Sequence, residues 1–365
     1  MKLECSIEKL KNALHKVERV AGKNLSLPVL SSILLVASNK NFKIRATNLS
    51  LGVEIEIPAK IEIEGTTAVN GQILSGVFSN ISKDDNVLLD LSNGNLSIKT
   101  RNNNILIKSD SFDDFPTLPT VKENCFTINS QKIVDGIKSV YYSGAVSDIK
   151  PEFASVYIYS IDNNLVFVST DSFRLAEKKI KIKGIDNIGS ILIPIKNVSE
   201  ILRLLGDSNT DIKVCFNKNQ ISFFGEDFYI TSKIIDGIFP DYKQIISKEF
   251  QTEAVVLKED FINSLKVSNI FSDKFNQINL IIRPKSKIFE LNSKNIDVGE
   301  NNTRLEAALK GEDIELSFNY KYLLDCFQSI GSDSLTLYFN GANRPIIIRG
   351  ISDESFMYLV MPMNR

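Results

Sequence analysis

The sequence predicts an α+β fold in which three tandem domains each pack two helices on antiparallel sheets. Its 365 residues are too many for one hydrophobic core and suit two or three domains. Landmarks recur along the chain at intervals of about 125 residues, and a period of this length is too long for a solenoid repeat. The predicted domains are residues 1–120, 121–246 and 247–365.

Each predicted domain opens with a short strand that runs into an amphipathic helix. The helix starts lie at residues 6–10, 130–134 and 258–262. Ser6 and Ser130 are predicted N-caps, because a serine oxygen can accept a backbone N–H at the start of a helix. In the first helix one apolar stripe at helical spacing is predicted to face a sheet; it consists of Ile7, Leu10, Leu14 and Val17.

A second helix follows in each domain, and its three copies keep the same spacing. They cover residues 69–78, 193–202 and 318–327, and each copy has a proline or an asparagine near its start. The central copy continues to about residue 205, and its predicted buried stripe consists of Val198, Ile201, Leu202 and Leu205.

The segments between the helices alternate apolar and polar residues, as half-buried strands do. Examples are residues 86–91, 212–216 and 334–339. Turn residues such as Asn93-Gly94 separate these runs, which is typical of hairpins. A Phe-Pro pair at 115–116 recurs at 239–240, near the ends of the first two domains.

The composition narrows the class of protein. A hydrophobic share of 43% and a charged share of 24% are typical of soluble globular proteins. The N-terminus has no uninterrupted apolar segment and no stretch approaches the length of a membrane span, so we expect a cytoplasmic protein with no membrane partner. The cysteines show neither CxxC nor Cys/His spacing, which predicts free core thiols rather than disulfides or structural zinc at Cys5, Cys125, Cys215 and Cys326.

Positive charge is concentrated on the outward faces of the predicted helices, although the formal net charge is only −1. If equivalent helices lie side by side, these residues form one basic surface that attracts the phosphate backbone of duplex DNA. No recognition helix, zinc finger or RNA-binding motif accompanies them, which predicts backbone contact without base readout. The predicted DNA-facing residues on the helices are Lys9, Lys16, Arg19, Lys132, Lys138, Lys196, Arg203, Lys266 and Lys321.

Two other classes of function stay open from the residues alone. The acidic pairs Asp84-Asp85 and Asp113-Asp114 are compatible with a metal-dependent nucleic-acid enzyme, but no third ligand or base converges on either pair. There is no Gly-rich phosphate-binding loop of the Walker type, and His15 is the only histidine, so we expect no catalysis, metal or cofactor. A triplicated scaffold that binds no DNA is the other alternative, and the near-neutral charge favours it.

Four short motifs complete the pattern, at residues 27–30 (LPVL), 170–176 (TDSFRLA), 236–242 (DGIFPDY) and 361–363 (MPM). In this order, and together with the triplication, they resemble the bacterial β sliding clamp family, the processivity subunit of the replicative DNA polymerase, along the whole chain. Each motif is weak by itself, so the resemblance depends on their order and spacing.

The resemblance implies a head-to-tail homodimer whose six domains form a ring, with helices lining the hole around duplex DNA and sheets outside. Such an interface closes into a ring only if its rotation permits. The resemblance places a DNA-touching loop at Lys23 and Asn24. It maps the dimer contacts to Ile105, Ile107, Ile270, Phe271, Asp297 and Glu300.

The resemblance also implies a pocket between domains 2 and 3 that binds a short motif rich in Gln, Leu and Phe. The partners would be the replicative DNA polymerase catalytic subunit, the clamp loader and repair proteins. The family commonly has Gly where Ser172 stands and a basic residue where Gln244 stands, so this chain departs from the family pattern at both positions. The implied lining is Phe153, Thr170, Ser172, Phe173, Arg174, Leu175, Pro240, Gln244, Ile245, Phe275, Asn319, Tyr322, Pro345, Val360, Met361, Pro362 and Met363.

Overall fold

The computed structural model describes residues 1–22, 27–38, 41–81, 86–182, 188–206, 208–247 and 249–363. The chain divides into two compact units. Unit 1 contains residues 1–133 and 196–234, and unit 2 contains residues 134–195 and 235–365. The central third of the sequence therefore contributes to both units. Because the division into units does not follow the three repeats, it does not test the predicted domain boundaries near 120 and 246.

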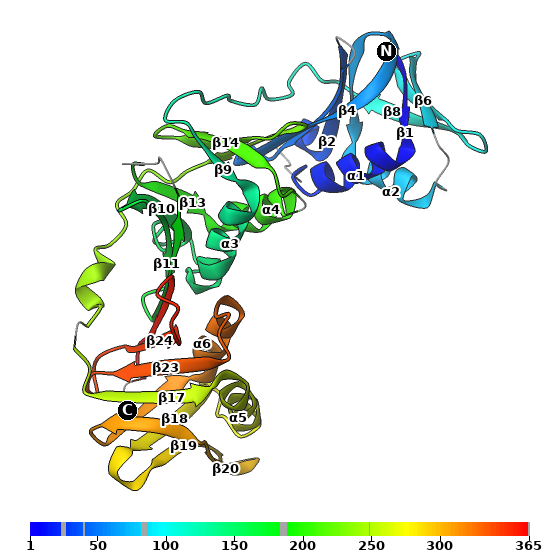
Figure 1. Cartoon of the computed structure of the whole chain (residues 1–365). Helices are drawn as coiled ribbons and strands as arrows, with labels where there is room; N and C mark the ends of the chain where they lie inside the picture. The colour runs from blue at the N-terminus through cyan, green and yellow to red at the C-terminus, as the bar shows by residue number, and fades with distance from the viewer. Residues whose placement is uncertain are drawn as a thin grey trace. The chain divides into compact units, whose positions relative to one another are not determined.

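Unit 1 is built on one 12-stranded sheet, in the order β1-β6-β7-β8-β5-β2-β3-β4-β16-β15-β14-β9, with β1 also paired to β4. Helices α1 and α2 pack against each other below the N-terminal part of the sheet (Figure 1). The strands are β1 (Lys2–Ser6), β2 (Ser32–Ser38), β3 (Asn41–Thr47), β4 (Leu51–Ile63), β5 (Gly65–Asn70), β6 (Asn86–Ser92), β7 (Asn95–Lys99), β8 (Asn104–Asp110), β9 (Phe126–Asn129), β14 (Asp211–Phe216), β15 (Gln220–Phe224) and β16 (Phe228–Lys233); the helices are α1 (Ile7–Glu18), α2 (Gly71–Asn80) and α4 (Ile195–Leu205).

The first helix forms as its sequence pattern predicts. The predicted apolar stripe of α1 is fully buried, with Leu10 and Leu14 each 1% exposed. The Ser6 side chain accepts the backbone N–H of Lys9, which confirms the predicted cap. In α2 the Asn70 side chain takes the same role toward Ile73.

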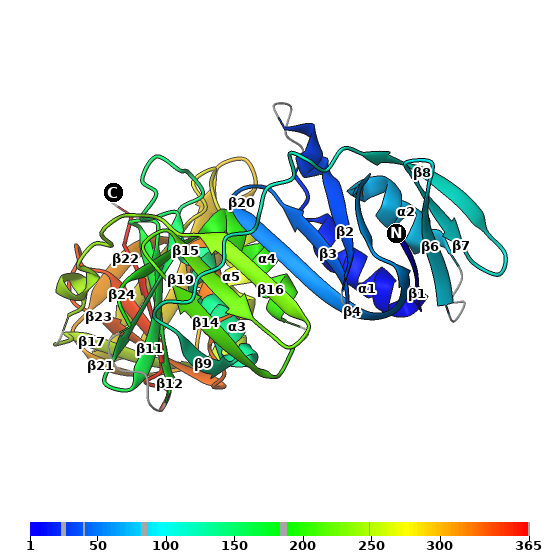
Figure 2. The same ribbon diagram turned by 90° about the horizontal axis from the view of Figure 1, so that it is seen from above.

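Strand β4 joins the first third of the sequence to the central third within unit 1. Its first residues pair on one side with β3 and on the other with β16 (Figure 2). Val53 lies opposite Ile230 in this pairing. Because β4 is 13 residues long, it has room to pair with β1 further along. One hydrogen-bonded sheet therefore crosses this junction.

Unit 2 is built on a 9-stranded sheet, in the order β13-β10-β11-β12-β25-β24-β23-β17-β21, and a 4-stranded sheet, in the order β20-β19-β18-β22. The strands are β10 (Ser155–Ile161), β11 (Asn164–Thr170), β12 (Arg174–Lys181), β13 (Ile191–Pro194), β17 (Thr252–Leu257), β18 (Gln277–Arg283), β19 (Ile288–Asn295), β20 (Gly299–Arg304), β21 (Ala307–Gly311), β22 (Ile314–Asn319), β23 (Ser334–Phe339), β24 (Ile346–Gly350) and β25 (Phe356–Val360); the helices are α3 (Ser130–Val140), which begins in unit 1, α5 (Lys258–Ile270) and α6 (Tyr320–Asp325).

Pairing between β12 and β25 joins the central third to the C-terminal third within unit 2. Leu175 lies opposite Leu359, and both side chains are buried in one core cluster. Phe239 and Tyr242, from the segment that follows the central third, pack into the same cluster. This cluster fixes the central and C-terminal parts of unit 2 to each other.

The repeat prediction is confirmed: among the described residues, each third of the chain has two α-helices on antiparallel strands. The helix pairs are α1 and α2, α3 and α4, and α5 and α6. The predicted strand runs lie in β6, β14 and β23, and the Asn93-Gly94 turn has positive φ at both residues, as a tight hairpin turn requires. Among the described residues, no helix has the length and apolar character needed to cross a membrane.

Two local predictions were wrong. Ser130 does not cap α3; its hydroxyl donates to Ser208 O, and the Asn129 side chain instead accepts the backbone N–H of Gln131. In α4 Val198, Ile201 and Leu205 are buried as predicted, but Leu204 is buried and Leu202 is half-buried, because the buried face is centred closer to Ile201 than to Leu202.

The cysteine prediction was half correct. Cys5 and Cys326 are free and buried, and burial raises the pKa of the Cys5 thiol to about 12. Cys125 and Cys215, however, form a disulfide. Phe126 of β9 lies opposite Val214 of β14, so the preceding residue, Cys125, meets Cys215 across the antiparallel pair. The two cysteines are 90 residues apart in sequence, so the sequence alone does not show this contact.

Candidate functional site

The turn between β11 and β12 is held in one conformation by its own side chains. The Asp171 carboxylate accepts the backbone N–H groups of Phe173 and Arg174, both at 3.0 Å. The Thr170 hydroxyl donates to Arg174 O and accepts the backbone N–H of Ser172. The turn therefore presents Phe173 to solvent, with 60% of its surface exposed, on a fixed backbone.

Ser172 adopts a backbone conformation that favours glycine. Its φ angle is +78°, in the left-handed region, where a Cβ atom crowds the following carbonyl. Thr170 and Asp171 stabilise this conformation through the hydrogen bonds to the turn. Serine at position 172, where the family commonly has glycine, is therefore compatible with this conformation of the β11–β12 turn.

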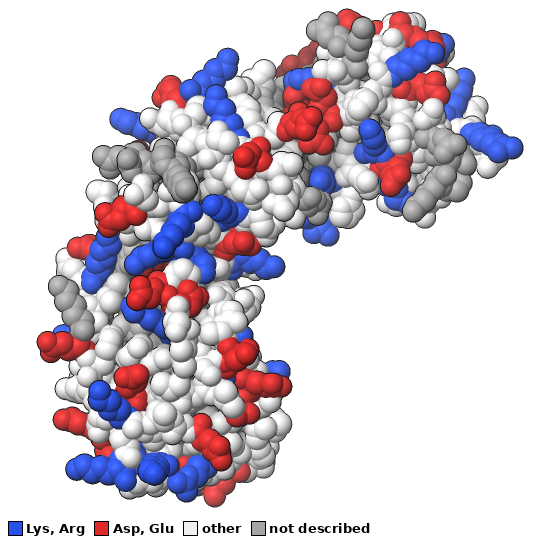
Figure 3. All heavy atoms as spheres, in the orientation of Figure 1, with Lys and Arg blue, Asp and Glu red and all other residues white. Residues whose placement is uncertain are grey.

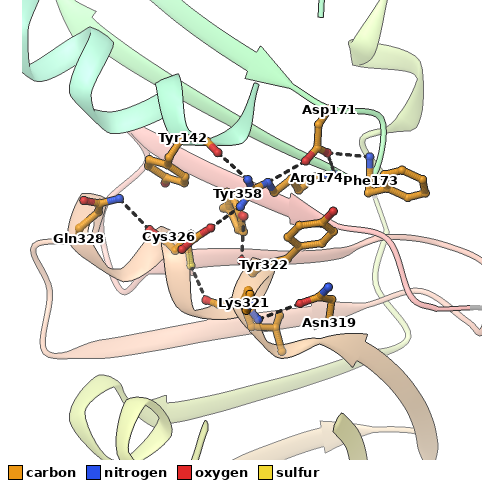
Figure 4. A network of polar contacts seen from close by, with 12 residues as sticks. Tyr142, Asp171, Phe173, Arg174, Asn319, Lys321, Tyr322, Cys326, Gln328 and Tyr358 are labelled. Carbon is orange, nitrogen blue, oxygen red and sulfur yellow. Dashed lines mark hydrogen bonds and ion pairs between the residues drawn. The ribbon is translucent and has the colours of Figure 1, made fainter. Parts of the chain in front are cut away.

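Arg174 joins the hairpin to α6 (Figure 4). Its guanidinium donates to Asp171 Oδ2 at 3.0 Å and to Tyr142 O at 2.6 Å, and it forms an ion pair with Asp325. It also lies over the Tyr322 ring, 4.5 Å from the centroid. Burial opposes its charge, but Tyr358, Asp325 and Asp171 together raise the pKa of Arg174, so the side chain stays charged.

The C-terminal segment lies between this hairpin and the small sheet. Met361 N donates to Phe173 O at 2.8 Å, and Met363 N donates to Ser317 O of β22 at 2.8 Å. The side chains of Met361, Pro362 and Met363 are half-buried. These residues therefore form a strip of adaptable apolar surface beside Phe173.

All of the predicted lining residues belong to unit 2, and the contacts above join Phe173, Arg174, Tyr322 and Met361. Phe275 is 58% exposed and Ile245 is 43% exposed. Asn276 O accepts the backbone N–H of Tyr320, which places the Phe275 loop beside the start of α6. The exposed or half-buried members that can contact a ligand are Phe153, Ser172, Phe173, Arg174, Pro240, Gln244, Ile245, Phe275, Asn319, Tyr322, Met361, Pro362 and Met363.

Four members of the predicted lining are buried and lie beneath this surface instead. Leu175 is 2% exposed and Val360 is 0% exposed, because both belong to strands in the middle of the 9-stranded sheet. Pro345, next to β24, and Thr170 are also buried. These four buried residues can support the exposed lining residues, but they offer little surface to a ligand.

Pro240, Gln244 and Ile245 lie in segment 235–247, which follows the central third of the chain. This segment is held by a buried polar contact, in which the Tyr242 hydroxyl donates to the Glu177 carboxylate. Burial and the adjacent Glu177 carboxylate raise the pKa of Tyr242, so the phenol stays protonated. Gln244 donates to Asp241 Oδ2 at 2.9 Å.

Three residues that hold Arg174 in place were not predicted as site residues from the sequence. Asp171 lies inside the motif at 170–176, and Asp325 lies inside the third copy of the second helix. Tyr142 contributes a backbone carbonyl, so its side-chain identity gives no signal. Asp325 is 151 residues from Arg174 in sequence, and only tertiary packing pairs them.

Family comparisons cover nearly the whole chain. The three domains described for the DNA polymerase III beta subunit match in order: the N-terminal domain at residues 1–119, the central domain at 127–241 and the C-terminal domain at 243–364. The chain belongs to the DNA polymerase III beta subunit family. It is a sliding clamp.

Named relatives and solved structures agree with this assignment. The beta sliding clamp of Buchnera aphidicola subsp. Acyrthosiphon pisum is 30% identical, with 96% of each chain covered. The beta sliding clamp of Synechococcus elongatus is 24% identical, with 100% of this chain and 99% of the relative covered. The DNA polymerase sliding clamp of Bacillus subtilis has the same fold, with a TM-score of 0.95 at 22% identity, and covers 100% of this chain and 99% of its own. The clamp of Pseudomonas aeruginosa, solved bound to griselimycin, also has a TM-score of 0.95 at 22% identity, with full coverage of both chains.

Most of the basic helix residues of this sliding clamp are exposed. On the face shown in Figure 3, basic and acidic side chains are intermixed. Lys16 is half-buried. Lys23 and Asn24 lie outside the described residues. The exposed members of the predicted set are Lys9, Arg19, Lys132, Lys138, Lys196, Lys266 and Lys321.

Arg203 differs from its prediction as an outward-facing DNA contact. It is half-buried and donates to His15 O at 3.1 Å and to Lys16 O at 2.6 Å, at the end of α1. It also forms an ion pair with Glu200. A cation at a helix C-terminus complements the helix dipole and satisfies free carbonyls. Arg203 thus fixes α4 beside α1 within unit 1.

The predicted dimer residues lie on or beside two strand edges. The first five residues of β8 pair only with β7, and β20 ends the 4-stranded sheet. Ile270 is 63% exposed, Asp297 and Glu300 are exposed, and Phe271 is half-buried.

Ile107, which the resemblance maps to the dimer contact, is buried within its own chain. It is 5% exposed, whereas Leu106 is 66% exposed, because successive residues of β8 point to opposite faces. Ile105 is half-buried on the same face as Ile107. Leu106 is therefore the apolar residue that this strand presents to solvent.

Only one of the two acidic pairs considered as possible metal ligands lies within the described residues. Asp84 and Asp85 lie outside the described residues. Asp113 and Asp114 are exposed. Within the described ranges, no three or more His, Cys, Asp or Glu residues are grouped so that they could hold a metal ion.

Proposed function

We propose that this sliding clamp encircles duplex DNA as a head-to-tail homodimer and tethers its partners through the site around Arg174. The partners would be the replicative DNA polymerase catalytic subunit, the clamp loader and repair proteins that carry a Gln/Leu/Phe-type motif. Because chromosomal DNA is the proposed track, the cytoplasm is the proposed location. The protein would carry out no reaction of its own.

The rigid apolar site in unit 2 is the observation that supports tethering. Phe173 and Phe275 are more than half exposed, and the backbone beneath Phe173 is fixed by Asp171 and Thr170. Burial of exposed aromatic and methionine side chains against a peptide's Leu and Phe anchors supplies most of the free energy at such sites. A preformed surface also avoids the entropy cost of ordering loops on binding.

Two free strand edges support the homodimer. An exposed edge with unpaired N–H and C=O groups is a template for pairing with another chain. Leu106 lies on β8, and Ile270 lies at the end of α5, in the C-terminal third that also holds β20. Since the two edges differ, pairing β8 of one copy with β20 of the next is heterologous, and two such contacts close a ring if the rotation permits.

Topological retention tests encirclement directly. The protein is loaded on nicked circular plasmid, and the plasmid is then linearised. A linked ring slides off the ends, whereas an ordinary DNA-binding protein remains. Retention on linear DNA with free ends would contradict the proposal, and linear DNA with blocked ends is the control that keeps a ring in place.

The partner site is tested separately by Met361→Ala. We expect the affinity for a Gln/Leu/Phe motif peptide to fall by about 1–3 kcal/mol in titration calorimetry, because truncation removes apolar contact at the site. Met361 N still donates to Phe173 O in this variant, so the backbone is preserved. Ile351→Ala, an exposed apolar residue outside the predicted lining, is the control, and equal affinity in all three proteins would exclude this placement.

A further inference from the structure

The segment that joins β8 to β9 is irregular along its whole length (Figure 1). We call its last part, residues 118–125, the strap. At the start of the strap, Leu118 packs on β4, where a Cβ atom built on Gly52 would lie 2.5 Å from Leu118 Cδ2. At its end, Cys125 is bonded to Cys215 of β14. The strap therefore crosses one face of the unit 1 sheet from β4 to β14, over β16 and β15, which lie between them.

The strap crosses a row of small residues on this face of the sheet. The register places one residue of each of the four adjacent strands in the row, namely Gly52, Thr231, Ser222 and Cys215. The side chains of the row are buried, with exposed fractions of 2% for Thr231, 0% for Ser222 and 1% for Cys215. With the strap fastened at both ends of the row, these side chains are shielded from solvent.

Hydrogen bonds hold the strap between its two ends. The Tyr229 hydroxyl donates to Pro119 O, and Phe216 N donates to Glu123 O at 3.1 Å. The Asn124 side chain donates to Phe216 O at 3.2 Å. Glu123 and Asn124 are exposed, so water can replace the partners of these hydrogen bonds at little net cost. The disulfide is therefore the strongest constraint on the end of the strap next to β9.

The two cysteines of the disulfide differ in their access to solvent. Cys125 is exposed, whereas Cys215 is 1% exposed in the covered row. A thiolate opens a disulfide by attacking one sulfur, and the other sulfur leaves. Because a solute can approach only Cys125, this residue is the one attacked and Cys215 is the leaving group. The cytoplasm is the proposed location of the protein, and disulfides there are usually transient or redox-sensing.

We propose that Cys125 is a site of thiol–disulfide exchange with a low-molecular-weight thiol, and that this exchange releases the strap. The small thiolate bonds to Cys125 Sγ, the bond to Cys215 breaks, and its electron pair leaves on Cys215 Sγ. Cys215 then takes a proton from water, because burial destabilises a thiolate. The product is a mixed disulfide at Cys125 beside a free thiol at Cys215. Attack by Cys215 on the mixed disulfide expels the small thiol and fastens the strap again.

This exchange site lies in unit 1, and its chemistry requires neither DNA encirclement nor partner binding. The first test uses the unmodified full-length protein with reduced glutathione as the probe. Acid stops the exchange at successive times, and peptide mass spectrometry identifies the cysteine that carries glutathione. We expect about tenfold more adduct on Cys125 than on Cys215, because only Cys125 is exposed. Urea below the unfolding transition should leave the exchange rate unchanged, since the attacked sulfur is accessible in the folded protein.

Two results of this test overturn the proposal. One is an adduct that forms mainly on Cys215. The other is an exchange rate that rises steeply with urea, which would mean that the disulfide opens only when the protein unfolds.

A second test asks whether opening of the disulfide frees the strap. The unmodified chain and Cys125→Ser are digested briefly with trypsin, without reductant. We expect cleavage after Lys122, an exposed strap residue, to be about tenfold faster in the variant, because a protease cuts a segment that opens locally. Cleavage after Lys218, an exposed residue in the β14–β15 turn, should be equal in both proteins and is the internal control. Unchanged cleavage after Lys122, or equal acceleration at both lysines, overturns the proposed release.

Discussion

The guanidinium of Arg174 lies over the ring of Tyr322, 4.5 Å from its centroid, and forms an ion pair with Asp325 on the same helix. Arg174 belongs to β12 in the central third, and both partners belong to α6 in the C-terminal third. One side chain therefore couples the two parts of unit 2 at the proposed partner site.

We predict that Arg174→Lys weakens motif-peptide binding by about 1–2 kcal/mol. Lysine keeps the charge, but it cannot both stack on the ring and donate in several directions from one plane. Titration calorimetry with the peptide measures the effect, and Lys218→Ala, outside the site, should bind as the unmodified chain does. Wild-type affinity in the lysine variant would show that the network only supports the fold.

Ser172→Gly should stabilise the protein by about 0.5–1 kcal/mol. Glycine adopts the left-handed φ of +78° without the steric cost that serine pays, although it also gains entropy in the unfolded chain. Thermal or urea unfolding reports the change. Ser172→Ala keeps the Cβ atom and should give no gain, so equal stabilisation by both variants would reject the conformational explanation.

Reduction of the Cys125–Cys215 disulfide should destabilise the part of unit 1 that contains β9 and β14. The bond joins residues 90 apart, and in the chain-entropy description closing a loop of this size in the unfolded chain stabilises the fold by up to about 4.6 kcal/mol. We expect dithiothreitol to lower the thermal midpoint of the unmodified chain and to leave that of Cys125→Ser unchanged. Superimposable melting curves with and without reductant would argue against a stabilising disulfide.

Leu106 and Ile107 should respond to substitution in opposite ways. Leu106→Asp places a charge on the exposed face of β8 and should shift the protein from dimer to monomer in light scattering, with little change in folding. Ile107→Ala removes buried volume and should cost about 2–4 kcal/mol of folding free energy. A Leu106→Asp protein that stays dimeric would remove β8 from the proposed interface.

The sequence by itself determined the local elements. Helical spacing in α1 correctly predicted the buried stripe from Ile7 to Val17, and the Asn93-Gly94 pair correctly predicted a hairpin turn. The 170–176 motif marked the turn that presents Phe173. These features depend on residues that are close together in the chain, so period and turn chemistry are sufficient to predict them.

Only the tertiary structure decided how distant segments meet. The pairing of β9 with β14 joined Cys125 to Cys215, and the packing of α4 against α1 turned Arg203 inward. The register of β8 against β7 decided that Leu106, rather than Ile107, faces solvent. In each case the partners are far apart in sequence or the strand has two equivalent faces, and a local pattern contains no information about which segment packs on which face.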